Sequence, residues 1–175
     1  LAEAAWQGDG AIAGDDTIPA HLRFLGGEWA CVPFGKSGAD PVVHGFGTDN
    51  CWTFEARGEE DGDAVALVID YPEDRPVERL RRTVRGVPGA ARVEFTLEVT
   101  ARRDCVLPIG LHPILAPGLA GEQLLIEGVW AYGETFPVTF ERGVSRLAPG
   151  ARFDDAGALP LVDGGTVSFG SLLSE

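Results

Sequence analysis

RVEFTLEVT, residues 92–100, has the clearest periodicity in the chain, and its period is two. Apolar and polar residues alternate over the whole stretch, so an extended strand here has one apolar face and one wet face. The turn-forming segment Gly86–Gly89 precedes it, and Val77–Val84 before that turn alternates more weakly. Together these segments predict an antiparallel β-hairpin.

Further strand candidates lie on both sides of this hairpin. Ala64–Tyr71 is a short run rich in Val and Ile, followed by Pro72, and its length and branching favour a buried strand over a helix. No segment shows a sustained apolar pattern of period 3.6. The remaining candidates are Cys51–Ala56, Val106–Leu115, Leu124–Val129, Val138–Glu141 and Thr166–Phe169. We therefore predict an all-β fold, an antiparallel β-sandwich.

Length and composition favour one globular domain over residues 1–175, with the Gly-, Asp- and Ala-rich residues 1–20 loosely ordered. The net charge of −13 argues against nucleic acid and against an anionic membrane surface as partners. Five arginines lie between Arg75 and Arg85. They form either a local positive stripe or, the interpretation that we favour, a solvated strand face beside acidic neighbours. No stretch reaches the roughly 18 apolar residues of a membrane span.

The three cysteines, Cys31, Cys51 and Cys105, are odd in number and contain no C-x-x-C pair. This usage favours a reducing compartment, hence the cytoplasm, over a disulfide framework. The histidines have no supporting cysteine or carboxylate spacing, so we predict no metal site. Gly26–Gly35 is not a G-x-G-x-x-G motif, which argues against a dinucleotide cofactor.

Two of the three histidines lie in segments with unusual backbone chemistry. Pro113 disfavours the α region for His112, so this histidine is expected in extended backbone. Gly110 on the same strand face lacks a side chain, which predicts an approach for a ligand along that face. A core histidine bonded to backbone carbonyls explains His112 equally well, and the sequence leaves both interpretations open.

His44 precedes Gly45 at an expected strand end or loop, where binding residues often lie. Asp49, Asn50 and Trp52 follow closely. A carboxylate and an amide hold sugar hydroxyls by hydrogen bonds, and an indole packs on the C–H face of a sugar ring. Trp52 is also, and more simply, explained as a core residue of its strand.

An ordered set of three motifs resembles the aldose 1-epimerase (galactose mutarotase-like) family. The motifs are Gly26–Gly35 (GGEWACVPFG), His44-Gly45-Phe46 followed by Trp52, and Leu111-His112-Pro113. Segments 133–137 and 160–165 are similar to the later, less distinctive part of that family's domain. The resemblance covers about Leu22 to Phe169.

The resemblance implies a large β-sandwich, the super-sandwich, that interconverts the α and β anomers of a hexose or related sugar without metal or cofactor. His112 would be the general acid at the ring oxygen, and His44 would hold the substrate and polarise the same region. Phe34, Asp49, Asn50 and Trp52 are the expected substrate-binding residues. A carboxylate from a later strand would be the base.

Three positions depart from the family pattern. Leu25 and Thr48 stand where the family often has arginines, so we expect a neutral sugar rather than a sugar phosphate. The catalytic glutamate of the family would lie beyond Glu175, so we expect a sandwich without its C-terminal strands. The sequence leaves open whether a second copy of the chain pairs with the exposed edge in a homodimer. The alternatives are a carbohydrate-binding module without turnover and a structural β-sandwich.

Overall fold

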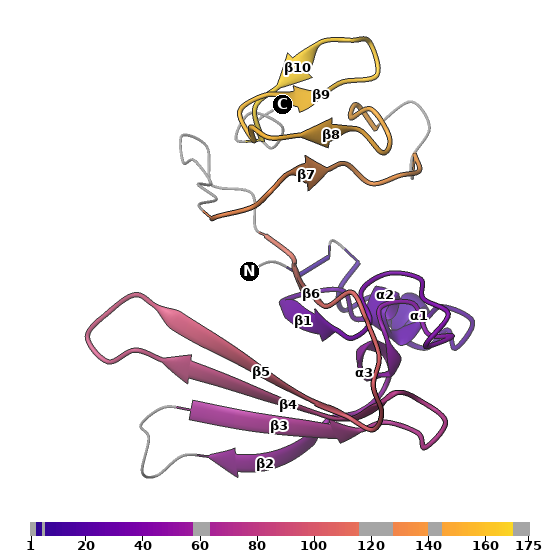
Figure 1. Ribbon diagram of the computed structural model, residues 1–175, viewed down its shortest axis with the longest axis vertical. Coiled ribbons are helices and arrows are strands. Elements are labelled where there is room, and N and C mark those ends of the chain that lie inside the picture. Colours follow the sequence, from indigo (N-terminus) through magenta and orange to yellow (C-terminus); the bar gives the residue numbers. More distant parts are fainter. Residues whose placement is uncertain (1–2, 5, 58–63, 116–127, 140–144, 170–175) are drawn as a thin grey trace. The chain divides into compact units, whose positions relative to one another are not determined.

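The computed structural model describes residues 3–4, 6–57, 64–115, 128–139 and 145–169. These residues form mostly antiparallel β-sheets with few helices, which confirms the all-β class (Figure 1). The chain divides into two compact units, Leu1–Leu115 and Ala116–Glu175, and each is described by itself. The expectation of a single sandwich domain stays a prediction.

The first unit contains a four-stranded antiparallel meander in the order β2-β3-β4-β5. Its strands are β2 (Thr53–Arg57), β3 (Ala64–Asp70), β4 (Val77–Gly86) and β5 (Val93–Ala101). Each coincides within a few residues with a predicted segment. The predicted turn after β4 is present, because the Val87 amide donates to the Arg92 carbonyl at 3.0 Å. The period-two pattern therefore located this sheet correctly.

A second, two-stranded sheet joins β1 (Glu28–Cys31) to β6 (Gly110–Pro113). The sequence did not indicate β1, and β6 is shorter than the predicted Val106–Leu115. In the antiparallel register Trp29 faces His112 and Cys31 faces Gly110. The strand β6 ends at Pro113, and one further bond in the same register runs from the Ile114 amide to the Gly27 carbonyl at 2.8 Å.

Three one-turn helices accompany this sheet among the described residues: α1 (Gly10–Ala13), α2 (Ala20–Arg23) and α3 (Phe46–Asp49). The Asp9 side chain caps α1 by accepting from the Ala11 amide at 2.8 Å. Helix α2 follows Pro19, whose fixed φ suits the start of a helix. None of the described helices is long and apolar enough to span a membrane.

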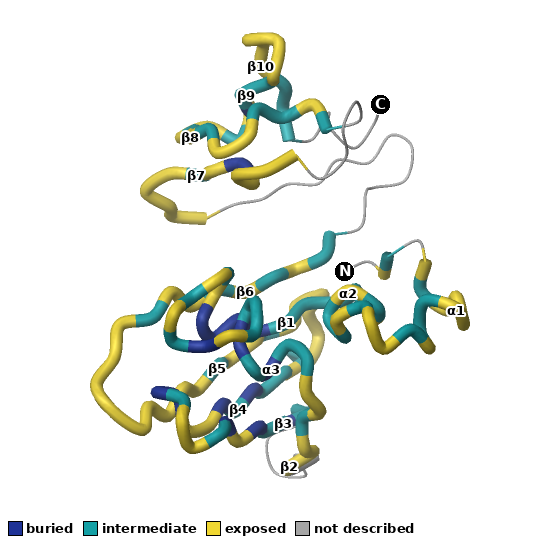
Figure 2. The backbone as a smooth tube through the Cα atoms, turned by 90° about the vertical axis from the view of Figure 1, so that its right-hand side faces the viewer, coloured by how far each residue is buried: buried dark blue, intermediate teal, exposed yellow. Residues whose placement is uncertain are grey.

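The core of the first unit lies between the meander and the segment that follows β1 (Figure 2). Its buried members are Val32, Ile69, Tyr71, Val77 and Leu80, with Phe46, Trp52, Leu97 and Leu107 packed against them. The apolar face predicted for residues 92–100 is covered mainly at Leu97. Val93, Phe95 and Val99 remain 54%, 42% and 36% exposed, so most of this face is accessible to solvent.

The five arginines between Arg75 and Arg85 all pair with carboxylates. Arg79, Arg81 and Arg85 do so on the exposed face, as the sequence interpretation expected. Arg82 differs, because its guanidinium and the Glu28 carboxylate form an ion pair in which both side chains are more than nine-tenths buried. This pair ties β1 to β4 from inside the core.

The second unit has two short ladders, β7 (Gly133–Glu134) with β8 (Arg152–Phe153) and β9 (Leu159–Pro160) with β10 (Thr166–Val167). Of the strands predicted here, Thr166–Phe169 coincides with β10. Val138 and Thr139 are not in a strand, and the rest of Val138–Glu141 lies outside the described residues, as does most of Leu124–Val129.

Candidate functional site: a cluster of three histidines

The three histidines of the chain, far apart in sequence, converge in the first unit. The rings of His44 and His112 meet edge to face with centroids 5.3 Å apart, and those of His21 and His44 with centroids 6.1 Å apart. We call these three side chains the histidine cluster. The sequence singled out His44 and His112, and the family resemblance assigned both to one region of a substrate, but it did not single out His21.

His112 is placed by its strand pairing. Because Trp29 is its direct cross-strand partner, the indole lies parallel to the imidazole, with centroids 4.2 Å apart and planes 6° apart. Nδ1 of His112 is buried and makes no hydrogen bond to another described residue. Burial lowers the pKa of His112, and the charge of His21 acts in the same direction, against the opposing effect of the His112 backbone. Stacking and burial thus favour the neutral ring of His112.

His44 is placed by a strained loop. It has φ of 66°, uncommon outside glycine, and Gly45 follows with φ of 87°. A Cβ on Gly45 would lie 2.1 Å from the Val32 carbonyl oxygen, so only glycine fits there. The Gly35 amide donates to Nδ1 of His44 at 3.1 Å. An Nδ1 that accepts leaves the proton of the neutral ring on Nε2, so His44 offers a donor there.

The electrostatics keep His44 neutral as well. Burial lowers its pKa, and the neighbouring His112 and His21 lower it further when they are charged. Asp49 acts in the opposite direction. Two imidazoles in contact cannot both be protonated without repulsion. The His44–His112 pair is therefore built to hold at most one extra proton.

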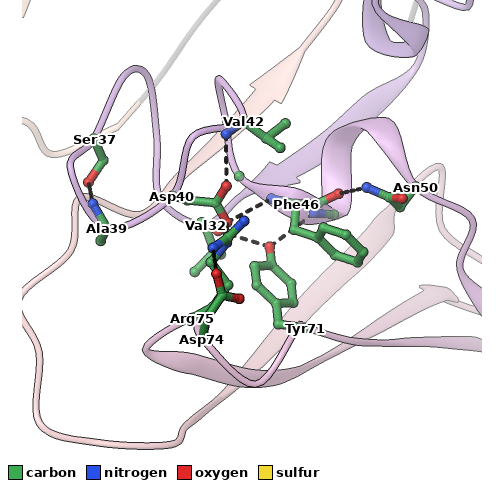
Figure 3. A network of polar contacts seen from close by, with 12 residues as sticks. Val32, Ser37, Ala39, Asp40, Val42, Phe46, Asn50, Tyr71, Asp74 and Arg75 are labelled. Atoms are coloured by element: carbon green, nitrogen blue, oxygen red, sulfur yellow. Dashed lines mark hydrogen bonds and ion pairs between the residues drawn. The ribbon is translucent and has the colours of Figure 1, made fainter.

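Buried polar contacts hold the loop that carries His44 (Figure 3). The carboxylate of Asp40, which is 3% exposed, accepts from the Val42 amide at 2.8 Å and the Phe46 amide at 3.3 Å. The guanidinium of Arg75 lies 3.5 Å from the same carboxylate. These contacts fix the chain on both sides of His44, so they hold His44 in its left-handed backbone conformation.

Tyr71 anchors the same loop to the core (Figure 3). Its hydroxyl donates to the Val32 carbonyl at 2.8 Å and accepts from the Gly47 amide at 3.1 Å. Burial raises the pKa of Tyr71 to about 12, so the hydroxyl keeps the proton that it donates. The ring position of His44 therefore depends on the residue that follows β3 as well as on its own loop.

His21, which the sequence did not single out, completes the cluster from α2. Its Nδ1 lies 2.6 Å from Oδ1 of Asp49 at the end of α3, and its backbone amide donates to the same oxygen at 2.9 Å. The His21 side chain is 12% exposed and that of Asp49 25%. Only the packing of α2 on α3 brings these residues together, so no local sequence signal could have identified His21.

Phe34 joins the cluster, but in a way that corrects one expectation. Its ring lies 5.1 Å from that of His44 and 6.3 Å from that of His112, centroid to centroid. A Cβ on Gly110 would come within 2.5 Å of the Phe34 ring. The space beside Gly110, predicted to admit a ligand, is therefore filled by Phe34, which is itself 41% exposed.

The other predicted substrate-binding residues make different contacts. Asp49 is engaged by His21. The side-chain amide of Asn50 donates to the Phe46 carbonyl at 2.8 Å. The Trp52 indole donates to the Gly47 carbonyl at 2.8 Å, and its ring packs on the core. Asn50 and Trp52 thus stabilise α3, and their part in sugar binding stays a prediction. Trp29, which the sequence did not propose, stacks on His112.

The donor set does not resemble a metal centre. Among the described residues, no group of three or more His, Cys, Asp or Glu side chains is placed to hold a metal ion. Cys31 is buried, and burial followed by the charge of Glu28 raises the pKa of its thiol to about 12. A thiol in this state is neither a ligand nor a nucleophile at neutral pH. The chemistry available to the site is therefore that of its imidazoles.

No family model matches the chain, and neither a curated protein nor a solved structure matches it. The class that the structure itself defines is an all-β protein with three imidazoles gathered beside two aromatic side chains.

Proposed function

We propose that the histidine cluster binds a sugar and interconverts its anomers, an aldose 1-epimerase-like activity on a galactose mutarotase-like fold. The observation that carries this proposal is the contact between His44 and His112, whose ring centroids lie 5.3 Å apart. These are the two histidines to which the sequence resemblance assigns the acid and polarising roles. Their convergence is what that assignment requires.

The chemistry needs two proton movements and no redox step. Opening the ring of a cyclic sugar requires a proton for the ring oxygen and loss of the proton from the anomeric hydroxyl. His112 delivers the first proton in this proposal. His44, whose neutral ring carries its proton on Nε2, donates a hydrogen bond to an oxygen of the substrate.

Aromatic rings next to the imidazoles support a sugar rather than another small molecule. Trp29 stacks on His112, and Phe34, which is itself 41% exposed, lies against both His44 and His112. Aromatic rings pack well on the C–H face of a sugar. The missing arginines at Leu25 and Thr48 favour a neutral sugar, which remains part of the proposal.

The test is anomer exchange by NMR, with glucose and galactose, on the whole chain and on His112→Ala and His44→Ala. We expect exchange faster than in buffer, reduced on the order of 10²–10⁴-fold in His112→Ala because a positioned acid contributes about that much. Arg92→Ala, an exposed change just before β5, is the control and should exchange like the unmodified chain. Exchange that survives in His112→Ala would contradict the assigned acid.

A carbohydrate-binding module without turnover is the second candidate, and one observation favours it. The pKa values of His44 and His112 are both lowered, chiefly by burial, so at neutral pH both rings are mainly neutral hydrogen-bonding groups. This candidate predicts that the sugar perturbs the His44 and His112 NMR signals while anomer exchange stays at the buffer rate. Perturbed signals together with accelerated exchange would exclude it.

A further inference from the structure

His21 and His44 have opposite hydrogen-bonding character at Nε2. An ionised carboxylate only accepts, so the 2.6 Å contact with Asp49 places a proton on Nδ1 of His21 and leaves Nε2 of the neutral ring with its lone pair. In His44 the Gly35 amide occupies Nδ1, and the proton is on Nε2. At Nε2, the ring of His21 therefore accepts a hydrogen bond, whereas that of His44 donates one.

This tautomer of His21 is held by more than one contact. The same Asp49 oxygen also accepts from the backbone amide of His21, so ring and main chain are fixed to one point. The side chain is largely enclosed, and the charge of His21 influences the pKa values of both His44 and His112. A base oriented by a third group is the arrangement that general-base catalysis uses.

We propose that His21 is the general base of the site and that Asp49 is its positioning residue. The proposal rests on the proposed epimerase function. The family resemblance implies that a carboxylate from a later strand accepts the proton. In this proposal a histidine of the first unit takes that role instead.

The proton balance closes within the cluster. Nε2 of His21 takes the proton of the anomeric hydroxyl while the bond between the anomeric carbon and the ring oxygen breaks. The electron pair of that bond goes to the ring oxygen, which receives a proton from His112, and the anomeric carbon becomes an aldehyde. The aldehyde then rotates about its bond to the next carbon. As the ring closes to the other anomer, the former ring hydroxyl returns its proton to His112, and Nε2 of His21 gives its proton to the aldehyde oxygen.

The experiment measures anomer exchange and its saturation with sugar for His21→Gln and Asp49→Asn. We expect His21→Gln to lower kcat on the order of 10²–10⁴-fold with KM nearly unchanged, because only the proton transfer is removed. Asp49→Asn keeps an acceptor oxygen but loses the charge, so it should lower kcat by less. Asp16→Asn is the matched control. The exposed Asp16 carboxylate pairs with Arg23, which lies on the same helix as His21, and this ion pair is outside the histidine cluster.

Two results would overturn the base assignment: unchanged kcat in His21→Gln, whether or not KM changes, or no exchange by the unmodified chain. The last also removes the proposed function, whereas loss of exchange in His112→Ala but not in His21→Gln leaves that function standing. If His21→Gln fails to fold by its NMR spectrum, Asp49→Asn decides, and its unchanged kcat would overturn the assignment.

Discussion

The indole of Trp29 lies flat on the imidazole of His112 because the two residues are direct partners in the β1–β6 ladder. Their centroids are 4.2 Å apart. An aromatic pair of this kind contributes on the order of 0.5–1.5 kcal/mol beyond the area it buries. The same stacking removes water from one face of His112 and so contributes to the burial that lowers its pKa.

Replacing Trp29 with alanine should therefore raise the pKa of His112 toward its ordinary value of 6.5, because water regains access to the ring. The measurement is an NMR titration of the His112 ring protons. Trp6→Ala is the control, since the Trp6 indole donates to the Leu22 carbonyl and lies outside the ring contacts of the cluster. An unchanged His112 titration in Trp29→Ala would contradict this account of the burial.

In the proposed mechanism His112 donates a proton, so anomer exchange should depend on pH. The protonated fraction of His112 falls as pH rises through its pKa, which lies below 6.5. We therefore expect the alkaline limb of the exchange profile to be centred on the acid side of that value. A limb centred well above it, or a flat profile, would show that another group gives the proton.

Stability should also depend on pH, with a defined sign. In the folded chain His44 and His112 lose their protons at lower pH than in the unfolded chain, so between the two pKa values the unfolded chain binds more protons. The free energy of unfolding therefore falls as pH drops from about 6.5 toward the lowered pKa values. Urea unfolding at several pH values should show this slope, and the double variant His44→Gln/His112→Gln should flatten it. An equal slope in both proteins would refute the linkage.

Gly45→Ala should destabilise the first unit by about 1–3 kcal/mol, because it combines a left-handed backbone with a collision. The new methyl would lie 2.1 Å from the Val32 carbonyl oxygen. Gly38→Ala is the control and should change little, because a Cβ at that position would have no neighbouring atom within 4 Å. Thermal unfolding of both variants measures the difference, and equal melting temperatures would contradict the prediction.

Arg82→Met should cost roughly 3–5 kcal/mol, because it leaves the Glu28 carboxylate buried without its partner. Burial already raises the pKa of Glu28 against the opposing charge of Arg82. The double variant Glu28→Leu/Arg82→Met removes both charges and should recover most of the loss. Chemical unfolding of the two single variants and the double variant measures this, and purely additive losses would show that the charges do not interact.

Alternation was sufficient to predict the meander but not the sheet that positions the site. The strands β2 to β5 pair with neighbours in sequence, so their pattern and turns are visible locally. The strand β1 breaks the pattern because Glu28, a charged residue, faces the core toward Arg82. A buried charge indicates a strand only when its distant partner is known.

The site shows the same division between local and long-range information. His44 and His112 could be selected because Gly45 and Pro113 indicate unusual backbone. Phe34 lies beside them, and its expected contact with substrate stays a prediction. His21 has no such neighbour, and its contact with Asp49 arises from the packing of α2 against α3. Sequence indicated which residues are unusual, whereas structure showed which of them meet.

The strands β1 and β6 pair with each other, and the whole β2–β5 meander lies between them in the sequence. Closing so long a loop costs chain entropy that the local hairpins of the meander do not incur. We therefore expect the meander to fold first and the ladder that aligns Trp29 with His112 to form late. On the ribosome, the cluster cannot assemble until His112 has emerged, so the chain acquires its chemistry only after most of its first unit is synthesised.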